Sequence, residues 1–158
     1  MSPRPSRPPR PPRPPRAALR LHVTAVEMRL DVPSDLDVVG DAVELVAGRL
    51  PAGTLSPRRL SFNFRTALAE ALANAIRYGT CEDPARVVRV RVELRRDAVR
   101  IHVDDGGAGF DTSVVPDPTR PENLEREDGR GLFVMRHLVD DVAFNEKGNG
   151  ICLTLRAG

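Results

Sequence analysis

Residues 67–79 read ALAEALANAIRYG and say more about the architecture of this chain than any other stretch. Glu70 and Asn74 are four positions apart, so a helix places both side chains on one face, one turn from each other. The amide oxygen of an asparagine is a good ligand for Mg²⁺, and a carboxylate one turn away can accept a proton from water or from a substrate hydroxyl. One interpretation of this pair is therefore a metal-binding Asn74 with a base at Glu70. The alternative is a solvated polar stripe on an amphipathic helix.

A second motif comes after two Val-rich stretches, where residues 101–111 read IHVDDGGAGFD. A predicted strand ends in two acids and continues into a glycine-rich turn. Gly106, Gly107 and Gly109 leave the backbone free to adopt positive φ and to approach a ligand closely. At the end of the strand, Asp105 can accept a hydrogen bond from an exocyclic amine such as that of adenine. An ordinary Asp-Gly turn is the alternative.

A third motif lies in residues 128–140, DGRGLFVMRHLVD. Gly129 and Gly131 flank Arg130 directly before a predicted short helix over 131–138. Free backbone N–H groups at the start of a helix bind phosphate, and Arg130 adds a charge-assisted contact to a terminal phosphate. The alternative is a glycine-containing loop followed by a capped helix.

Two common nucleotide-binding motifs are excluded. Thr112 stands where the dinucleotide fingerprint requires a third glycine. The chain has a single lysine, Lys147, and no GK[ST] sequence, which excludes a P-loop.

The order of the predicted elements indicates the fold class. Strands follow one another directly, without regular βα alternation, which favours an α+β two-layer sandwich with helices on one face of a mostly antiparallel sheet. Ser34 is the predicted N-cap of the first helix, with Asp37 in the capping-box position. We expect strands over 19–31, 86–95, 98–103, 139–144 and 151–155, and helices over 36–50, 56–78 and 131–138.

The composition is that of a soluble globular chain, with 41% hydrophobic and 29% charged residues among 158. No stretch approaches the roughly 20 apolar residues that cross a bilayer, and the N-terminus lacks the apolar run of a secretory signal. These features predict a cytoplasmic protein that does not contact membranes. In a reducing compartment, Cys81 and Cys152 are expected to be small buried hydrophobes.

The N-terminal segment differs from the rest. Residues 1–16 hold eight of the fifteen prolines and five arginines; without those arginines, 19 basic residues remain against 22 acidic ones. We predict a disordered or polyproline tail over 1–18 and one folded domain over 19–158. The tail can attract nucleic acid by charge, but it has no aromatic side chain for base stacking, so nucleic acid is not an expected partner.

Three motifs, taken in order along the chain, resemble the Bergerat ATP-binding fold shared by gyrase, ninety-kilodalton heat-shock chaperones, histidine kinases and MutL. They are Glu70-x-x-x-Asn74, Asp105-x-Gly107-x-Gly109-Phe110 and Gly129-Arg130-Gly131-Leu132. The stretch 115–142, VPDPTRPENLEREDGRGLFVMRHLVDDV, is more specifically similar to RsbW-type anti-sigma-factor serine kinases. The resemblance covers roughly residues 26–156.

This resemblance implies an ATP-binding domain that uses Mg²⁺. By it, Asn74 holds Mg²⁺, Glu70 is the base and Asp105 contacts the adenine amine. Gly107, Gly109 and Phe110 belong to the adenine side, and Gly129, Arg130, Gly131 and Leu132 to the phosphate side. Residues 112–128 form a short lid. The family phosphorylates a serine of an anti-anti-sigma protein, sequesters a sigma factor when free, and commonly forms homodimers.

One position departs from the family pattern. The last strand of the family begins Gly-Thr, with the threonine near adenine, whereas here Ile151 follows Gly150. Thr154 is not expected to replace that hydroxyl.

Other functions stay open. The chain could be a catalytically weak ATP-binding module that only sequesters a partner. A histidine kinase needs a phosphoacceptor histidine in a helical pair, and His22, His102 and His137 lie in no such pair.

Overall fold

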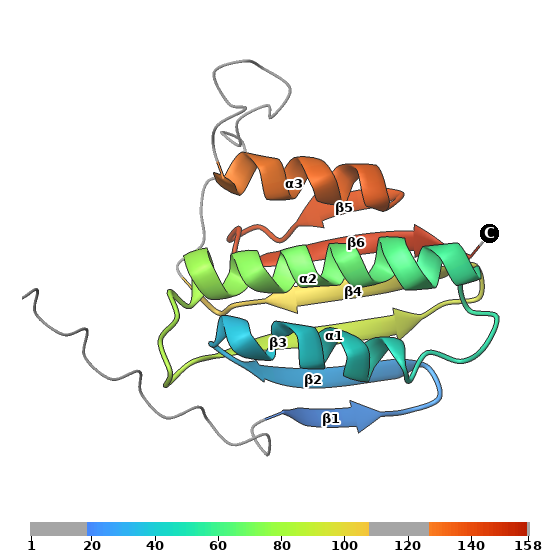
Figure 1. Ribbon diagram of the computed structural model, residues 1–158, viewed down its shortest axis with the longest axis horizontal. Coiled ribbons are helices and arrows are strands. Elements are labelled where there is room, and N and C mark those ends of the chain that lie inside the picture. Colours follow the sequence, from blue (N-terminus) through green and yellow to red (C-terminus); the bar gives the residue numbers. More distant parts are fainter. Residues whose placement is uncertain (1–18, 108–126, 158) are drawn as a thin grey trace, which may run out of the picture.

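A six-stranded antiparallel sheet is the base of the described structure, with the strand order β1-β2-β3-β4-β6-β5 (Figure 1). The computed structural model describes residues 19–107 and 127–157, and in 127–130 only the backbone. The strands are β1 (Arg20–Val23), β2 (Glu27–Pro33), β3 (Val87–Leu94), β4 (Ala98–Asp104), β5 (Asp141–Phe144) and β6 (Gly150–Arg156).

The helices cover one face of this sheet (Figure 1). A 3₁₀ turn, η2 (Leu36–Val38), leads into α1 (Val39–Ala47), which packs over β2. A long helix follows, with an α-helical centre, α2 (Arg65–Asn74), between two π-helical segments, η3 (Arg59–Phe64) and η4 (Ala75–Gly79). It packs over β4, and α3 (Glu127–Leu138) lies beside it and contacts β5. The predicted α+β two-layer class is confirmed.

Alternation along the central strands separates core from surface. In β3, Val88, Val90 and Val92 are at most 2% exposed and face the helices, while Arg89 is exposed on the other side. Successive side chains of a strand point to opposite faces, so this pattern commits one face of the sheet to the core.

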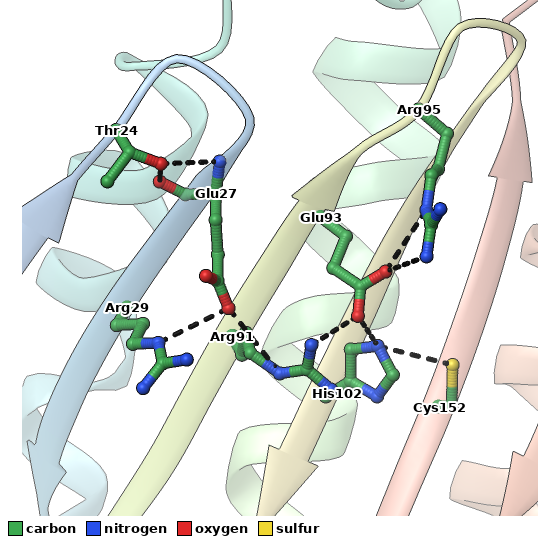
Figure 2. Close-up of polar contacts among 8 residues, drawn as sticks. All are labelled: Thr24, Glu27, Arg29, Arg91, Glu93, Arg95, His102 and Cys152. Atoms are coloured by element: carbon green, nitrogen blue, oxygen red, sulfur yellow. Dashed lines mark hydrogen bonds and ion pairs between the residues drawn. The ribbon is translucent and has the colours of Figure 1, made fainter.

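The opposite face carries an ion-pair network instead of helices (Figure 2). Glu93 of β3 pairs with Arg91 and Arg95, and its Oε1 lies 3.0 Å from Nε2 of His102 on β4. Glu27 of β2 pairs with both Arg29 and Arg91. Two of these contacts join neighbouring strands, Glu27–Arg91 between β2 and β3 and Glu93–His102 between β3 and β4, and the network keeps this face polar.

The long helix buries small and aliphatic side chains on its sheet-facing side: Ala67, Leu68, Ala71, Leu72, Ala75 and Ile76. Glu70 and Asn74 lie outside that stripe and are half-buried. Their position on the flank of the helix turns them toward α3.

Several predicted boundaries were wrong. Residues 19–31 form a hairpin of β1 and β2 and not one strand; its turn is closed by Thr24, whose Oγ1 accepts the N–H of Glu27 at 3.1 Å. Asp35 caps the first helix by accepting the N–H of Asp37, whereas Ser34 is buried and hydrogen-bonded to Thr80. The hydroxyl of Ser34 is engaged by Thr80 and does not cap, and its N–H continues the sheet by donating to the carbonyl of Arg86.

The cysteine expectation was wrong for Cys81, which is exposed, while Cys152 is half-buried. Cys81 lies in an exposed turn after η4, with φ +53°, outside the packed elements. None of the helices among residues 19–107 and 127–157 is long and apolar enough to cross a bilayer.

Candidate functional site

Glu70, Asn74 and Gly131 meet where α2 packs against α3. A Cβ built on Gly131 would lie 3.0 Å from Nδ2 of Asn74 and 3.2 Å from Oε2 of Glu70. The same point is 3.4 Å from Oδ1 of Asn74, so the backbone of α3 rests directly on both polar side chains. Residues 57 positions apart in sequence are therefore in contact, and the glycine makes that contact possible.

The opposite ends of the two helices fix this alignment. Nδ2 of Asn63 donates to the carbonyl of Leu138 at 2.8 Å. The guanidinium of Arg59 pairs with Asp140, directly after α3, also at 2.8 Å. Because the start of the long helix is tied to the end of α3, the helices run antiparallel, and the start of α3 reaches Glu70 and Asn74.

The donor set here suits a hard cation. Oε2 of Glu70 and Oδ1 of Asn74 lie 3.2 and 3.4 Å from the position that a Cβ on Gly131 would take, so the two oxygens are neighbours. Mg²⁺ takes one or two protein oxygens and fills its remaining positions with water and phosphate oxygens. The amide oxygen of Asn74 therefore fits as a ligand of Mg²⁺, with the carboxylate of Glu70 beside it. Among the described residues, no group of three or more His, Cys, Asp or Glu side chains is arranged to hold a metal ion by itself.

Asp105 follows β4 directly and lies against the end of η4. Its Oδ1 accepts the N–H of Gly107 at 2.6 Å. A Cβ on Gly79 would lie 2.2 Å from both Cγ and Oδ2 of Asp105, a contact that no side chain permits. Glycine at position 79 is thus required for the carboxylate to approach the helix.

Burial raises the pKa of the Asp105 carboxyl above its ordinary 3.8. The hydrogen bond from Gly107 and the charge of Arg86 oppose this rise in pKa, and the neighbouring Asp104 adds to it. In its ionised form the group accepts hydrogen bonds through both carboxylate oxygens.

The glycines of this loop serve different purposes. Gly106 has φ +65°, in the region that favours glycine. Gly107 does not have positive φ; a Cβ there would lie 2.7 Å from Oδ1 of Asp105 and 3.0 Å from the carbonyl oxygen of Gly79. Gly107 is therefore required by close approach, not by backbone conformation.

Two residues that contact this loop, Arg86 and Asn149, were not predicted from the sequence motifs. Arg86 donates from Nη1 to the carbonyl of Gly79 and from Nη2 to the carbonyl of Asp105, both at 3.3 Å. Nδ2 of Asn149, in the turn between β5 and β6, donates to the carbonyl of Gly107 at 2.9 Å. Neither residue belongs to a local motif, because each binds backbone groups that are distant in sequence.

For the remaining predicted site residues, the structure describes only some positions. Gly129 and Arg130 lie inside the first turn of α3, which begins at Glu127 and so four residues earlier than predicted. A glycine costs only about 1 kcal/mol in a helix, which is too little to delay its start when the helix packs well. Leu132 is 6% exposed within the core, so a contact with a ligand stays a prediction. Gly109, Phe110 and most of the predicted lid lie outside the described residues.

Alternation along β6 decides where the hydroxyl of Thr154 lies. Leu153 and Leu155 are fully buried on the helix side, so Thr154 lies on the opposite face of the sheet. It cannot support a ligand beside Asp105. Ile151 is half-buried and pairs with Val103 of β4.

The ionisable cluster on the open face of the sheet is separate from this site. Burial would raise the pKa of Glu93, but the hydrogen bond from Arg95 and the charges of Arg91 and His102 outweigh it and hold the pKa below its ordinary value. Burial and the charge of Arg91 lower the pKa of His102, although Glu93 opposes them. These residues stabilise the face opposite to the helices.

Comparison with known proteins agrees with this arrangement. Residues 32–157 match the family model of the histidine kinase-like ATPase domain. The serine-protein kinase RsbW of Oceanobacillus iheyensis is 26% identical over 134 residues, which cover 77% of this chain and 79% of that protein. The anti-sigma F factor of Clostridium beijerinckii is 33% identical over 96 residues, or 58% of this chain and 66% of that protein.

The serine-protein kinase RsbW of Staphylococcus aureus is 30% identical over 98 residues, or 57% of this chain and 62% of that protein. The matched regions of the second and third relatives thus span slightly less than two thirds of their lengths. The family match, in contrast, covers most of this chain and includes both ends of the site built above. The chain belongs to the histidine kinase-like ATPase domain family.

Proposed function

We propose that this protein is an ATP-binding anti-sigma regulatory factor with protein-serine kinase activity. It transfers the γ-phosphate of ATP to a serine of an anti-anti-sigma partner, and it sequesters a sigma factor when that partner is phosphorylated. The relatives named serine-protein kinase RsbW and anti-sigma F factor support this assignment.

The proposal is carried by the placement of two groups of polar side chains along the long helix, Glu70 with Asn74 and, at its end, Asp105. Glu70 and Asn74 touch α3 at Gly131, and Gly79 touches Asp105. Gly79 follows Glu70 by nine positions along the helix, which is about 13 Å at roughly 1.5 Å per residue. That length is comparable with an extended nucleoside triphosphate, whose base would meet Asp105 and whose terminal phosphate would meet Glu70 and Asn74.

The roles follow from phosphoryl-transfer chemistry, which depends mainly on positioning and charge neutralisation. Asn74 holds the metal through its amide oxygen, and Glu70 accepts the proton of the attacking serine hydroxyl. Mg²⁺ supplies the positive charge that balances the phosphate oxygens. Asp105 accepts a hydrogen bond from the adenine amine and so sets the position of the base.

The start of α3 is the natural phosphate site. The first four N–H groups of a helix, here those of residues 127–130, have no partner within the helix and favour an anion. Arg130 adds a positive charge in the same turn. Gly129 in this turn and Gly131 directly after it contribute through their backbone.

A module that binds ATP but only sequesters a partner is the second candidate. Glu70 favours the kinase, because a pure binding protein does not need a base beside the metal ligand. The two candidates differ in whether the partner gains a phosphate.

Phosphoryl transfer with labelled ATP tests the proposal. The partner is first captured from the native cytoplasm with and without ATP, and it is then incubated with the purified chain, Mg²⁺ and γ-labelled ATP. We expect the wild type to label a serine of the partner. Glu70→Gln should bind nucleotide but lose at least about a hundredfold in rate, since general base catalysis contributes that much. Asn74→Ala should lose Mg²⁺-dependent transfer.

Glu44→Gln is the matched control, because Glu44 pairs with Arg65 away from the site. Labelling at the wild-type rate by both Glu70→Gln and Asn74→Ala would refute the proposed roles. Nucleotide binding without any labelling of the partner would favour the sequestering module.

The assembly and location belong to the same proposal. We expect a cytoplasmic homodimer, which light scattering after gel filtration measures directly. Nucleic acid is not an expected partner. Salt-dependent binding that disappears on deletion of residues 1–18 would contradict that expectation.

A further inference from the structure

We propose that Arg86 and Asn149 are positioning residues that give the site its specificity for adenine. They do so by holding the loop of Asp105 and Gly107 in place. This inference rests on the proposed function, because it takes Asp105 as the group that meets the base.

Arg86 joins the two elements between which Asp105 lies. Its guanidinium donates to the carbonyl of Gly79 at the end of η4 and to the carbonyl of Asp105 after β4. The fork of an arginine is planar, so two simultaneous bonds fix the spacing between its acceptors. The spacing is critical here, because a Cβ on Gly79 would already lie 2.2 Å from Cγ of Asp105.

Asn149 holds the same loop from the opposite direction. Its side-chain N–H donates to the carbonyl of Gly107 at 2.9 Å, and its own carbonyl accepts the N–H of Asp105 at 3.0 Å. One residue thus binds the loop at both ends. The carboxylate of Asp105 closes the loop internally through the N–H of Gly107.

The turn that carries Asn149 is itself pre-organised. Oδ1 of Asn145 accepts the N–H of Asn149 at 3.0 Å, and Nδ2 of Asn145 donates to Oδ1 of Asn149 at 2.6 Å. Gly148 adopts φ +71° to close this turn, and a Cβ on Gly150 would lie 2.7 Å from Nδ2 of Asn145. Asn149 therefore reaches the loop from a rigid support.

A fixed loop matters for specificity because adenine and hypoxanthine differ in one group. Adenine offers an amine donor at the position where hypoxanthine carries a carbonyl oxygen, and a carboxylate held at that position accepts from the first and repels the second. A carboxylate free to turn away would lose this discrimination while the phosphate end of the site still bound. Arg86 also opposes, by its charge, the effect of burial on the pKa of Asp105 and so favours the carboxylate form.

The test compares the affinities of the full chain for ADP and for inosine diphosphate by titration calorimetry with Mg²⁺. The wild type should prefer ADP by roughly a hundredfold or more, as expected of a site built to hydrogen-bond one group. Arg86→Lys keeps the charge but loses the fork, and Asn149→Asp keeps the shape but loses the donor to Gly107. Each should reduce the ADP preference by about tenfold, the worth of one hydrogen bond at a charged group, mainly through weaker ADP binding.

The affinity for inosine diphosphate serves as the internal reference for folding. Arg89→Lys, on the exposed side of β3, is the matched control and should keep the wild-type ratio. If these residues had a merely structural role, the substitutions would weaken the binding of both nucleotides equally and leave the ratio of affinities unchanged. That result would overturn this inference but not the proposed function. If the wild type bound neither nucleotide, the proposed function would fail and this inference with it.

Discussion

Asp105 shows at the residue scale how one side chain serves the site at a cost to the fold. Its carboxyl is half-buried against Gly79, and burial raises its pKa above 3.8. The N–H of Gly107 and the charge of Arg86 compensate only in part. Because folding raises the pKa of this acid, its contribution to the free energy of unfolding is least favourable at pH values where the carboxylate is ionised.

Replacing Asp105 with asparagine separates these two effects. The amide oxygen can retain the bond from Gly107, but the charged acceptor for the adenine amine is lost, so ATP affinity should fall by about tenfold to a hundredfold. At pH 7 the variant should be more stable to urea than the wild type, because it buries no charge. That advantage should shrink as the pH falls through the raised pKa of Asp105 and vanish below about 3.8, where the wild-type carboxyl is protonated in both states. Unchanged affinity would contradict the adenine role.

We predict opposite effects on stability for alanine substitutions at Gly79 and at Gly40. Gly79→Ala places a Cβ 2.2 Å from Cγ of Asp105, so the loop must shift, at a cost of about 1–3 kcal/mol and with weaker nucleotide binding. Gly40→Ala meets nothing within 4 Å on helix α1 and should stabilise by about 0.5–1 kcal/mol. Chemical denaturation measures both. Equal effects of the two substitutions would show that the Gly79 contact is not formed.

At the scale of elements, the joint between the long helix and α3 determines the geometry of the site. Arg59 and Asn63 hold the end of α3, while Gly131 near its start lies on Glu70 and Asn74. The periodicity of residues 67–79 predicted the helix and the shared face of Glu70 and Asn74. It could not predict which element faces them, because that depends on the alignment of two helices that meet only in the folded chain.

Asp140 anchors this joint through the charge on its carboxylate. The hydrogen bond from Arg59, followed by that from the backbone of Arg156, lowers the pKa of Asp140 below 3.8. Asp140→Asn should therefore cost about 1 kcal/mol at pH 7, as expected of a partly exposed, hydrogen-bonded ion pair. Because the folded pKa is depressed, this stability is present above pH 3.8 and is lost as the pH falls through the folded value.

Urea melts at pH 7 and pH 3, combined with Arg59→Ala in a double-mutant cycle, measure the contribution of the pair. A pH-independent difference between wild type and Asp140→Asn would show that charge is not its cause.

At the scale of the molecule, the sheet separates two surfaces of different character. The helices cover one face, where we propose the nucleotide site, and a network of ion pairs lies on the other (Figures 1 and 2). The proposed ligand can therefore bind only the folded chain, because Glu70 comes from the helix layer and Asp105 from the end of a strand in the sheet. Ligand binding and folding are therefore linked.

Mg-ATP should raise the thermal stability of the whole chain. At about a hundredfold excess over the dissociation constant, the gain is about 2.7 kcal/mol, or roughly 5–10 °C for a domain of this size. Asn74→Ala should lose the part of the shift that depends on Mg²⁺. A melting temperature that does not respond to Mg-ATP would contradict a nucleotide site in the folded chain.

The sequence by itself determined the α+β class, the long helix with Glu70 and Asn74 on one face, and the placement of Asp105 at a strand end. These features follow from spacings of two to four residues, which act within a single element. Only the tertiary structure decided that Asp35 and not Ser34 caps the first helix, that Gly79 must lack a side chain, and that Arg86 and Asn149 hold the Asp105 loop. Those outcomes depend on groups far apart along the chain, such as Ser34 and Arg86 or Gly107 and Asn149, which approach one another only when the sheet and the helices have packed.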